Sequence, residues 1–217
     1  MRSAEAERKL RAVIDTPTPY EIVRGGIEII VTENVYPTSE LSELLVEVLD
    51  NPQLGIRGGE DVLDYGSGTG FLAINAALRG ANVVAIDVSR DAIACGQLNA
   101  ERHGVQDRIS FRLGENLNRI ENGETFDVIL AGMPWDDADA STVLERSLFD
   151  PGFQMRLALF DAAPRILKVG GRIILSSRDG HEVDYPQAYP QAHFMYVTGG
   201  RRVIRGVGHT AVVVTIR

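Results

Sequence analysis

Cysteine is scarce in this chain, and long apolar runs are missing. The 217 residues include one cysteine, so no internal disulfide can form, which is typical of a reducing compartment. No stretch reaches the ~20 apolar residues that a membrane-spanning helix needs. The segment MRSAEAERKLRAV lacks the apolar core of a secretory signal. The sequence therefore predicts a cytoplasmic protein with no membrane partner.

Basic side chains are outnumbered by acidic ones. The chain has 22 Lys and Arg against 30 Asp and Glu, for a formal net charge of −8 at pH 7. Because binding to phosphate backbones depends on Lys and Arg, this balance argues against broad nucleic-acid binding. No spacing of His, Cys or carboxylates is typical of a metal site, and the sequence has neither a Walker loop nor a serine-nucleophile elbow. We therefore expect no metal, and a small-molecule or protein substrate before a nucleic acid.

The segment before residue 60 is expected to form helices and a hairpin. Residues 4–14 predict a helix that ends before two prolines, because proline cannot continue a helix. Residues 22–31 contain a Gly-Gly turn between apolar runs and predict a hairpin. Residues 38–49 carry Leu and Val at helical spacing. We assign residues 1–59 to an extension that packs over the binding site, and residues 60–217 to the main domain.

After residue 60, short apolar runs alternate with helical segments. Continuous apolar strands separated by helices indicate a parallel sheet with helices on both faces. No helical segment separates the last two runs, so we expect them to pair as an antiparallel hairpin. The sequence predicts an α/β fold with a seven-stranded, mostly parallel sheet and a C-terminal antiparallel hairpin. The expected strands are 61–65, 82–87, 108–112, 126–131, 172–176, 193–198 and 210–216, and the expected helices are 70–80, 89–103 and 152–167.

The segment from Val62 to Leu72 is expected to be a strand, a glycine-rich turn and a helix. Its glycines let a ligand approach the backbone closely, and ligands of open α/β sheets bind at the carboxyl ends of strands. Asp64 precedes the loop, where a carboxylate would repel a pyrophosphate and attract a cation. Asp87 ends the next strand, about 20 residues after Gly66, a spacing that suits the hydroxyls of a ribose. A ribose joined to a cationic amino-acid end, without phosphate, describes S-adenosylmethionine.

The pattern D-x-G-x-G-x-G, the acid that closes the second strand and the final hairpin together resemble the class I S-adenosylmethionine-dependent methyltransferases, over residues 60–217. The resemblance implies a Rossmann-like fold, S-adenosylmethionine as cofactor and S-adenosylhomocysteine as product. It implies that the loop and its preceding acid hold the methionine end, that the second acid binds the ribose, and that later residues contact the adenine, with Asn116 the alternative to Glu115 there. The cofactor-binding residues so implied are Asp64, Gly66, Ser67, Gly68, Gly70, Asp87, Val88, Glu115 and Asn116.

The fourth strand is followed by Gly132-Met133-Pro134-Trp135-Asp136. The placement is similar to the (N/D)-P-P-(Y/F/W) motif of methyltransferases that modify planar amino groups. In that family a side-chain oxygen and a backbone carbonyl accept hydrogen bonds from the NH₂ group, and the aromatic ring packs on its plane. The resemblance implies that these five residues form the methyl-accepting site. Gly132 departs from the motif because it has no side-chain acceptor, and Asp136 or Asp137 can replace that acceptor or act as a general base.

The segment Val35-Tyr36-Pro37-Thr38-Ser39-Glu40 and the leucines after it resemble V-Y-x-P-x-E-x-x-x-L-L of the HemK-like glutamine methyltransferases. The proline is displaced by one position, so Thr38 stands where the family has proline. The resemblance implies that this segment lies over the cofactor and that Tyr36 belongs to the cofactor site.

These features predict a methyltransferase enzyme that acts on a nitrogen of a protein side chain or of a small metabolite. Three alternatives stay open at this point. The first is a methyltransferase for the N6 atom of adenine in RNA or DNA. The second is a small-molecule O-methyltransferase with Asp136, Asp137 or His181 as the base. The third is a non-catalytic partner subunit that binds S-adenosylmethionine, which Gly132 motivates. The oligomeric state is open as well.

Overall fold

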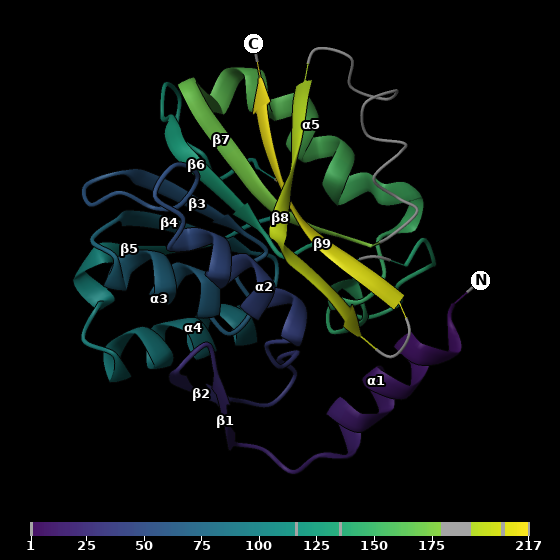
Figure 1. Cartoon of the computed structure of the whole chain (residues 1–217). Coiled ribbons are helices and arrows are strands. Elements are labelled where there is room, and N and C mark those ends of the chain that lie inside the picture. Colours follow the sequence, from purple (N-terminus) through teal and green to yellow (C-terminus); the bar gives the residue numbers. More distant parts are fainter. Residues whose placement is uncertain (1, 116, 135, 179–191, 205–206, 217) are drawn as a thin grey trace.

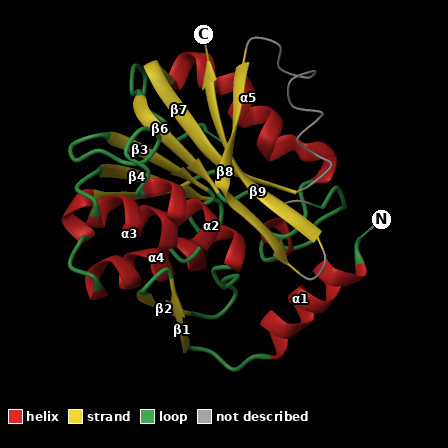
Figure 2. Ribbon diagram, viewed as in Figure 1, coloured by secondary structure: helices red, strands yellow, loops and turns green. Residues whose placement is uncertain are grey.

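The computed structural model describes residues 2–115, 117–134, 136–178, 192–204 and 207–216. A small N-terminal part leads into a large twisted sheet flanked by helices (Figures 1 and 2). The N-terminal elements are α1 (Ala4–Asp15), β1 (Tyr20–Arg24), β2 (Ile27–Val31) and α2 (Glu40–Leu49). They are followed by β3 (Asp61–Tyr65), α3 (Phe71–Leu78), β4 (Asn82–Asp87), α4 (Arg90–Arg102), β5 (Ile109–Leu113), β6 (Phe126–Ala131), α5 (Gln154–Ile166), β7 (Leu167–Arg178), β8 (Ala192–Ile204) and β9 (Val207–Ile216).

Seven of the described strands form one sheet, in the order β5-β4-β3-β6-β7-β9-β8. The five strands from β5 to β7 in this order pair in parallel. Strand β9 runs antiparallel between β7 and β8. The predicted sheet and its C-terminal antiparallel hairpin are therefore confirmed. The chain order changes direction between β3 and β6, and such a point opens a crevice at the carboxyl ends of the strands.

Helices cover both faces of the sheet, as predicted (Figure 2). Because side chains alternate along a strand, Val62 of β3 packs with α2, α3 and α4 on one face, and Leu63 packs with α5 on the other. Phe71 on α3 and Phe160 on α5 are among the largest fully buried side chains of the two layers. Burial of both faces explains why the central strands are continuous apolar runs rather than alternating ones.

Several element boundaries differ from the sequence prediction, and the structure gives a reason for three of them. Helix α5 starts at Gln154, because Gly152 and Phe153 adopt positive φ angles of 61° and 54°, which separate the preceding turn from the helix. Strand β7 starts at Leu167 rather than at residue 172, since Leu167 pairs with Phe126 across an irregularity in the register. Strand β8 is longer than expected, because a register shift between Tyr196 and Arg201 lets it continue.

The N-terminal segment contributes two kinds of packing. The predicted hairpin is confirmed as β1 and β2, which turn at Gly25 and Gly26 with φ angles of 52° and 80°. Helix α2 buries its leucines in the same core as α3 and the sheet. Helix α1 instead packs on residues 138–149. The division at residue 60 stays a prediction. None of the described helices is long and apolar enough to span a membrane.

Candidate functional site

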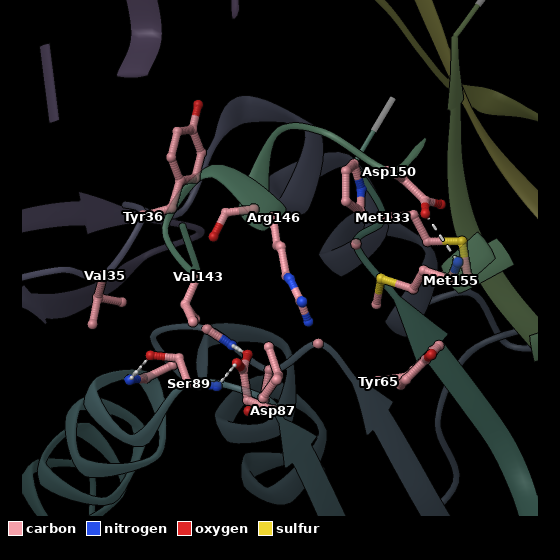
Figure 3. A pocket seen from close by; sticks show the side chains of 18 of the residues that line it. Val35, Tyr36, Tyr65, Asp87, Ser89, Met133, Val143, Arg146, Asp150 and Met155 are labelled. Carbon is pink, nitrogen blue, oxygen red and sulfur yellow. Dashed lines mark hydrogen bonds between the residues drawn. The ribbon is translucent and has the colours of Figure 1, made fainter. Parts of the chain in front are cut away.

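A cavity of about 440 Å³ lies at the carboxyl ends of β3, β4 and β6 (Figure 3). Residues 34–42, between β2 and α2, form one wall, and residues 140–155, between β6 and the first turn of α5, form another. Ligand cavities in proteins commonly measure ~300–1,000 Å³. The position is the crevice expected between β3 and β6.

The glycine loop between β3 and α3 has the backbone that the sequence predicts. Gly66, Gly68 and Gly70 have φ angles of 80°, 53° and 79°, a region that side chains with a Cβ rarely adopt. A Cβ on Gly70 would also lie 3.0 Å from the Cα of Gly96 on α4. The loop is therefore held close to α4, and Gly70 shapes it from behind without lining the cavity.

Asp64 is fully buried behind this loop and does not line the cavity. Its Oδ2 accepts a hydrogen bond from the N–H of Ala73 at 3.0 Å, which ties β3 to the first turn of α3. Its Oδ1 has no hydrogen-bond partner among the described residues. Burial raises the pKa of the Asp64 carboxyl to about 7, the Ala73 N–H opposes the shift, and the nearby Asp87 adds to it.

Asp87, at the end of β4, also lines the cavity. Its Oδ2 accepts from the N–H of Gly68 at 2.8 Å and its Oδ1 accepts from the N–H of Ser89 at 2.9 Å (Figure 3). Burial raises the pKa of this carboxyl, and these backbone groups oppose the rise. Each carboxylate oxygen has about two acceptor sites, so both can also accept from the hydroxyls of a ligand.

The wall between β2 and α2 is fastened to the glycine loop. The hydroxyls of Thr38 and Thr69 lie 2.7 Å apart and are buried. The amide of Asn99 on α4 donates to the carbonyls of both Ile30 and Thr69, at 2.9 and 3.0 Å. Thr38 occupies the position where the glutamine methyltransferases have proline, and its hydroxyl gives this departure a structural role.

Most of the residues expected to bind the cofactor lie together. Those that line the cavity are Tyr36, Gly66, Ser67, Gly68, Asp87, Val88 and Glu115. Glu115 also forms an ion pair with Arg146 at 2.7 Å, across the mouth of the cavity. Asn116 is outside the described residues.

The expected acceptor residues are only partly brought together. Gly132, Met133 and Pro134 line the cavity, whereas Trp135 and His181 are outside the described residues. Asp136 does not line the cavity, and its Oδ2 accepts from the backbone N–H of Ser3 at 3.1 Å. Asp137 does not line it either, and its Oδ1 accepts from the N–H of Gly152. Both carboxylates accept hydrogen bonds from backbone N–H groups outside the cavity. The structure therefore does not place either of them as the acceptor that is missing at Gly132.

One protein family matches most of this chain. The methyltransferase domain family matches residues 56–203. The chain belongs to this family. The match covers the glycine loop, Asp87 and the acceptor edge, and it confirms the resemblance to methyltransferases.

Two curated relatives of this methyltransferase domain are glutamine methyltransferases. The release factor glutamine methyltransferase of Chlorobaculum tepidum is 34% identical over 165 residues, 67% of this chain and 56% of that protein. The ribosomal protein uL3 glutamine methyltransferase of Bordetella pertussis is 31% identical over 171 residues, 72% of this chain and 57% of that protein. The chain thus spans a little over half the length of these two relatives.

A solved structure has the same fold. The T. thermophilus 16S rRNA N2 G1207 methyltransferase, in complex with AdoMet and guanosine, superposes with a TM-score of 0.70 at 20% identity. The alignment covers 93% of this chain and 52% of that one. This likeness confirms the Rossmann-like architecture of the methyltransferase domain.

The cavity of the methyltransferase domain fits S-adenosylmethionine in three respects. The Oγ of Ser67 is buried in the cavity wall, and no described residue is its hydrogen-bond partner. The unpartnered Oδ1 of Asp64 lies behind the same loop. At Gly68 nothing lies within 4 Å of where a Cβ would be, so the backbone is open to a ligand. Buried polar atoms are normally satisfied, which makes the Ser67 hydroxyl suited to contact the polar methionine end. The Asp64 carboxylate, behind the loop, can favour a nearby cationic group without touching it.

Sequence reasoning missed many of the residues that line the cavity outside the motifs. Among them are Tyr65, Arg146, Asp150 and Met155 (Figure 3). Asp150 precedes a Pro-Gly turn and a helix, a pattern that indicates helix capping and nothing more. Met155 and Arg146 belong to segments with no motif. Tyr65 ends β3 directly before the first glycine, so its position at the cavity was open to prediction.

Proposed function

We propose that this chain is an S-adenosylmethionine-dependent methyltransferase. Its substrate is the carboxamide nitrogen of a protein side chain, such as that of a glutamine. One observation carries the proposal: Asp87 with the glycine loop and the edge Gly132–Pro134 open into a single cavity. This arrangement supports a cofactor site and a site for a planar amino group that lie side by side. The two glutamine methyltransferase relatives support a protein substrate.

In this proposal S-adenosylmethionine, when bound, supplies a methyl group already activated on a sulfonium sulfur. The chain's own task is therefore positioning, which can lower a barrier by ~7–11 kcal/mol. Asp87 would accept from the ribose hydroxyls, Ser67 would bind the methionine end, and Val88 and Glu115 would contact the adenine.

The acceptor edge would hold the carboxamide. The backbone carbonyl of Met133 stands at the motif position that accepts from the NH₂ group, and Trp135 stands at the aromatic position. The carbonyl of Pro134 is approached by the Arg156 guanidinium at 3.5 Å, which steadies this loop from the side of α5. Apolar walls from Tyr36, Met133 and Phe149 would exclude water during the transfer.

A protein partner, a cytoplasmic location and a boundary at residue 60 belong to the same proposal. The acidic net charge supports a protein over a nucleic acid, because no excess of Lys and Arg is available for phosphates.

The test uses the chain with S-adenosylmethionine labelled in its methyl group and a bacterial extract that contains release factors, ribosomal proteins and RNA. Protein, RNA and small molecules are then separated, and the label is counted in each. We expect label on a glutamine nitrogen of one protein, identified by mass spectrometry, and much less label with Asp87→Ala at the same cofactor concentration. Calorimetry with S-adenosylhomocysteine is the second readout.

Each other outcome selects a different function. Label confined to RNA would contradict the proposal in favour of a base methyltransferase. Label in small molecules would indicate a metabolite substrate. Tight binding of S-adenosylhomocysteine without label in any fraction would favour a non-catalytic partner subunit.

A further inference from the structure

The proposed acceptor site lacks a hydrogen-bond acceptor at position 132. A carboxamide nitrogen carries two N–H bonds, and the backbone carbonyl of Met133 can accept only one of them in the geometry of the motif. Gly132 has no side chain for the second bond. The gap is not caused by crowding, since a Cβ on Gly132 would meet its nearest neighbour, Leu72 Cδ1, at 3.7 Å. The second N–H therefore needs an acceptor from elsewhere in the chain.

The backbone brings Asp150 back to the acceptor loop. Asp136 and Phe149 form a parallel β-bridge. The N–H of Asp150 donates to the carbonyl of Asp136 at 2.9 Å. Asp150 lines the cavity and is 4% exposed. Figure 3 draws it on the same side of the cavity as Met133 and Met155.

The Asp150 carboxyl has one oxygen in use and one to spare. Its Oδ1 accepts from the N–H of Met155 at 3.0 Å, which caps the start of α5 (Figure 3). Its Oδ2 is buried and has no hydrogen-bond partner in the described part of the chain. A helix cap needs a single oxygen. A second, buried and unsatisfied oxygen is costly, and at the wall of a cavity it points to a ligand.

The charged and polar groups around Asp150 agree with an anionic acceptor. Burial raises the pKa of the Asp150 carboxyl, and the N–H groups of Met155, Arg156 and Gln154, together with the Arg156 guanidinium, oppose the rise. On the opposite side, burial raises the pKa of the Tyr65 phenol, and the charges of Asp150 and Glu115 add to the rise. Tyr65 ends β3 next to the glycine loop, so the charge of Asp150 also influences this part of the cavity.

We propose that Asp150 Oδ2 accepts a hydrogen bond from the N–H of the methyl-accepting carboxamide and thereby replaces the side-chain acceptor that Gly132 lacks. This inference rests on the proposed function, because it concerns the acceptor half of the same cavity. The chemical group is the carboxylate that some members of the motif family carry at position 132. Here it comes from the start of α5 instead of the end of β6.

The test follows binding of acetamide, the smallest primary carboxamide, to the complex with S-adenosylhomocysteine. The chain contains four methionines, and two of them, Met133 and Met155, line the cavity. Labelling the methionine methyl groups with carbon-13 therefore places two NMR probes at the site. We expect acetamide to shift both signals in a saturable way.

The decisive variant is Asp150→Asn, which keeps an oxygen for the Met155 N–H and puts an NH₂ group where Oδ2 was. Two donors then face each other, so we expect acetamide to bind at least about fivefold more weakly. Asp161→Asn, the same change at an exposed position of α5, is the matched control and should bind as the wild type does. If Asp150→Asn does not fold, Asp150→Ser keeps the cap and also removes Oδ2.

Rescue makes the test specific. Adding Gly132→Asn to Asp150→Asn restores an acceptor at the family's own position, and we expect most of the lost acetamide affinity to return. N,N-dimethylacetamide, which has no N–H, should bind wild type and Asp150→Asn equally. S-adenosylhomocysteine affinity should stay within about twofold in all variants, because Asp150 lies on the acceptor side.

Two results would overturn the inference: equal acetamide binding by wild type and Asp150→Asn, or no acetamide binding by a wild type that binds S-adenosylhomocysteine. Failure of the proposed function looks different. In that case no protein is methylated in the extract, while the loss and rescue of acetamide binding are still observed.

Discussion

The two halves that we propose for the cavity, one for the cofactor and one for the acceptor, are built in different ways. The cofactor half comes from one continuous stretch, β3, the glycine loop, α3 and β4, in which Asp64 and Asp87 are held by backbone N–H groups of neighbouring turns. The acceptor half is assembled from segments far apart in the chain. Arg2 pairs with Glu145 at 2.8 Å, and Ser3 donates to Asp136. Hydrogen bonds between neighbouring elements hold the first half, and contacts between more distant segments hold the second.

This difference has a practical meaning. A site made of consecutive elements keeps its geometry whenever the sheet forms, so changes elsewhere should leave it intact. A site held together by α1, residues 136–150 and the start of α5 depends on all three being in place. Variants in the two halves should therefore separate cofactor binding from acceptor binding, and four predictions test how complete that separation is.

The largest effect is expected for Asp87→Ala. The variant removes the proposed partner of the ribose hydroxyls and leaves the N–H groups of Gly68 and Ser89 without their acceptor. We expect S-adenosylhomocysteine to bind roughly 10- to 100-fold more weakly by calorimetry. Asp107→Ala, at an exposed position, is the control. Unchanged affinity in Asp87→Ala would place the ribose elsewhere.

The second prediction concerns pH. The pKa of Asp64 is raised to about 7 in the free protein. A bound ammonium group favours the carboxylate, so binding should release a proton below that pH. Between about pH 5.5 and 7 the affinity for S-adenosylhomocysteine should therefore rise roughly tenfold and then level off. In Asp64→Asn the pH dependence should flatten. Calorimetry in two buffers with different ionisation enthalpies measures the released proton directly.

The same pKa determines a trend in stability. An unfolded aspartate ionises near pH ~4, whereas Asp64 in the folded free protein ionises near pH 7. Between these values the folded state holds the extra proton, so this residue's contribution to stability falls as pH rises from about 4 to about 7. Chemical denaturation of wild type against Asp64→Asn isolates the contribution. A wild-type stability that rises more steeply than that of the variant over this range would contradict the assignment.

The third prediction concerns a variant that should weaken acceptor binding and leave cofactor binding unchanged. Leu10 on α1 is buried against Leu148 and Phe149. Leu10→Ala should loosen this contact by about 2 kcal/mol. We expect acetamide to bind about threefold more weakly, as followed at the methyl signals of Met133 and Met155, with S-adenosylhomocysteine affinity unchanged. Ile14→Ala, at a position of the same helix that is 64% exposed, should change neither. Equal losses for both ligands would mean that the two halves are coupled.

The smallest effect is expected for Arg146→Ala. This side chain spans the cavity mouth to Glu115, but both partners are about half exposed. Exposed ion pairs contribute ~0–1 kcal/mol. Stability should therefore change very little, and S-adenosylhomocysteine affinity should rise by less than about threefold as Glu115 becomes available to the adenine. A loss of affinity would instead make Arg146 part of the cofactor site.

The cofactor half was the predictable half. The glycine spacing, Asp64 and Asp87 depend on backbone conformation and on strand ends, which local sequence specifies. The seven-stranded sheet was predictable for the same reason, since buried parallel strands are continuous apolar runs. The boundaries of α5 and β7 were not, because positive φ angles at Phe153 and a register irregularity at Phe126 depend on tertiary packing.

The acceptor half could be predicted only where it follows β6. Gly132, Met133 and Pro134 line the cavity as expected. Asp136 does not line the cavity, and its Oδ2 accepts from the N–H of Ser3. The choice of Asp150 requires knowing that residues 149 and 150 pair with the acceptor loop. Such pairing between distant residues has no local signal.

The contact between α1 and residues 136–149 also has a consequence in time. Arg2 donates to the carbonyl of Asp139, 137 positions further along. At ~5–20 residues per second, a ribosome needs roughly 7–27 s to make the chain between them. During that interval Ala6 and Leu10 lack the side chains of Ala138, Leu148 and Phe149 that complete their cluster, although β3, α3 and β4 are already made. Helix α1 can therefore reach its full packing only after the glycine loop and its flanking elements have left the ribosome.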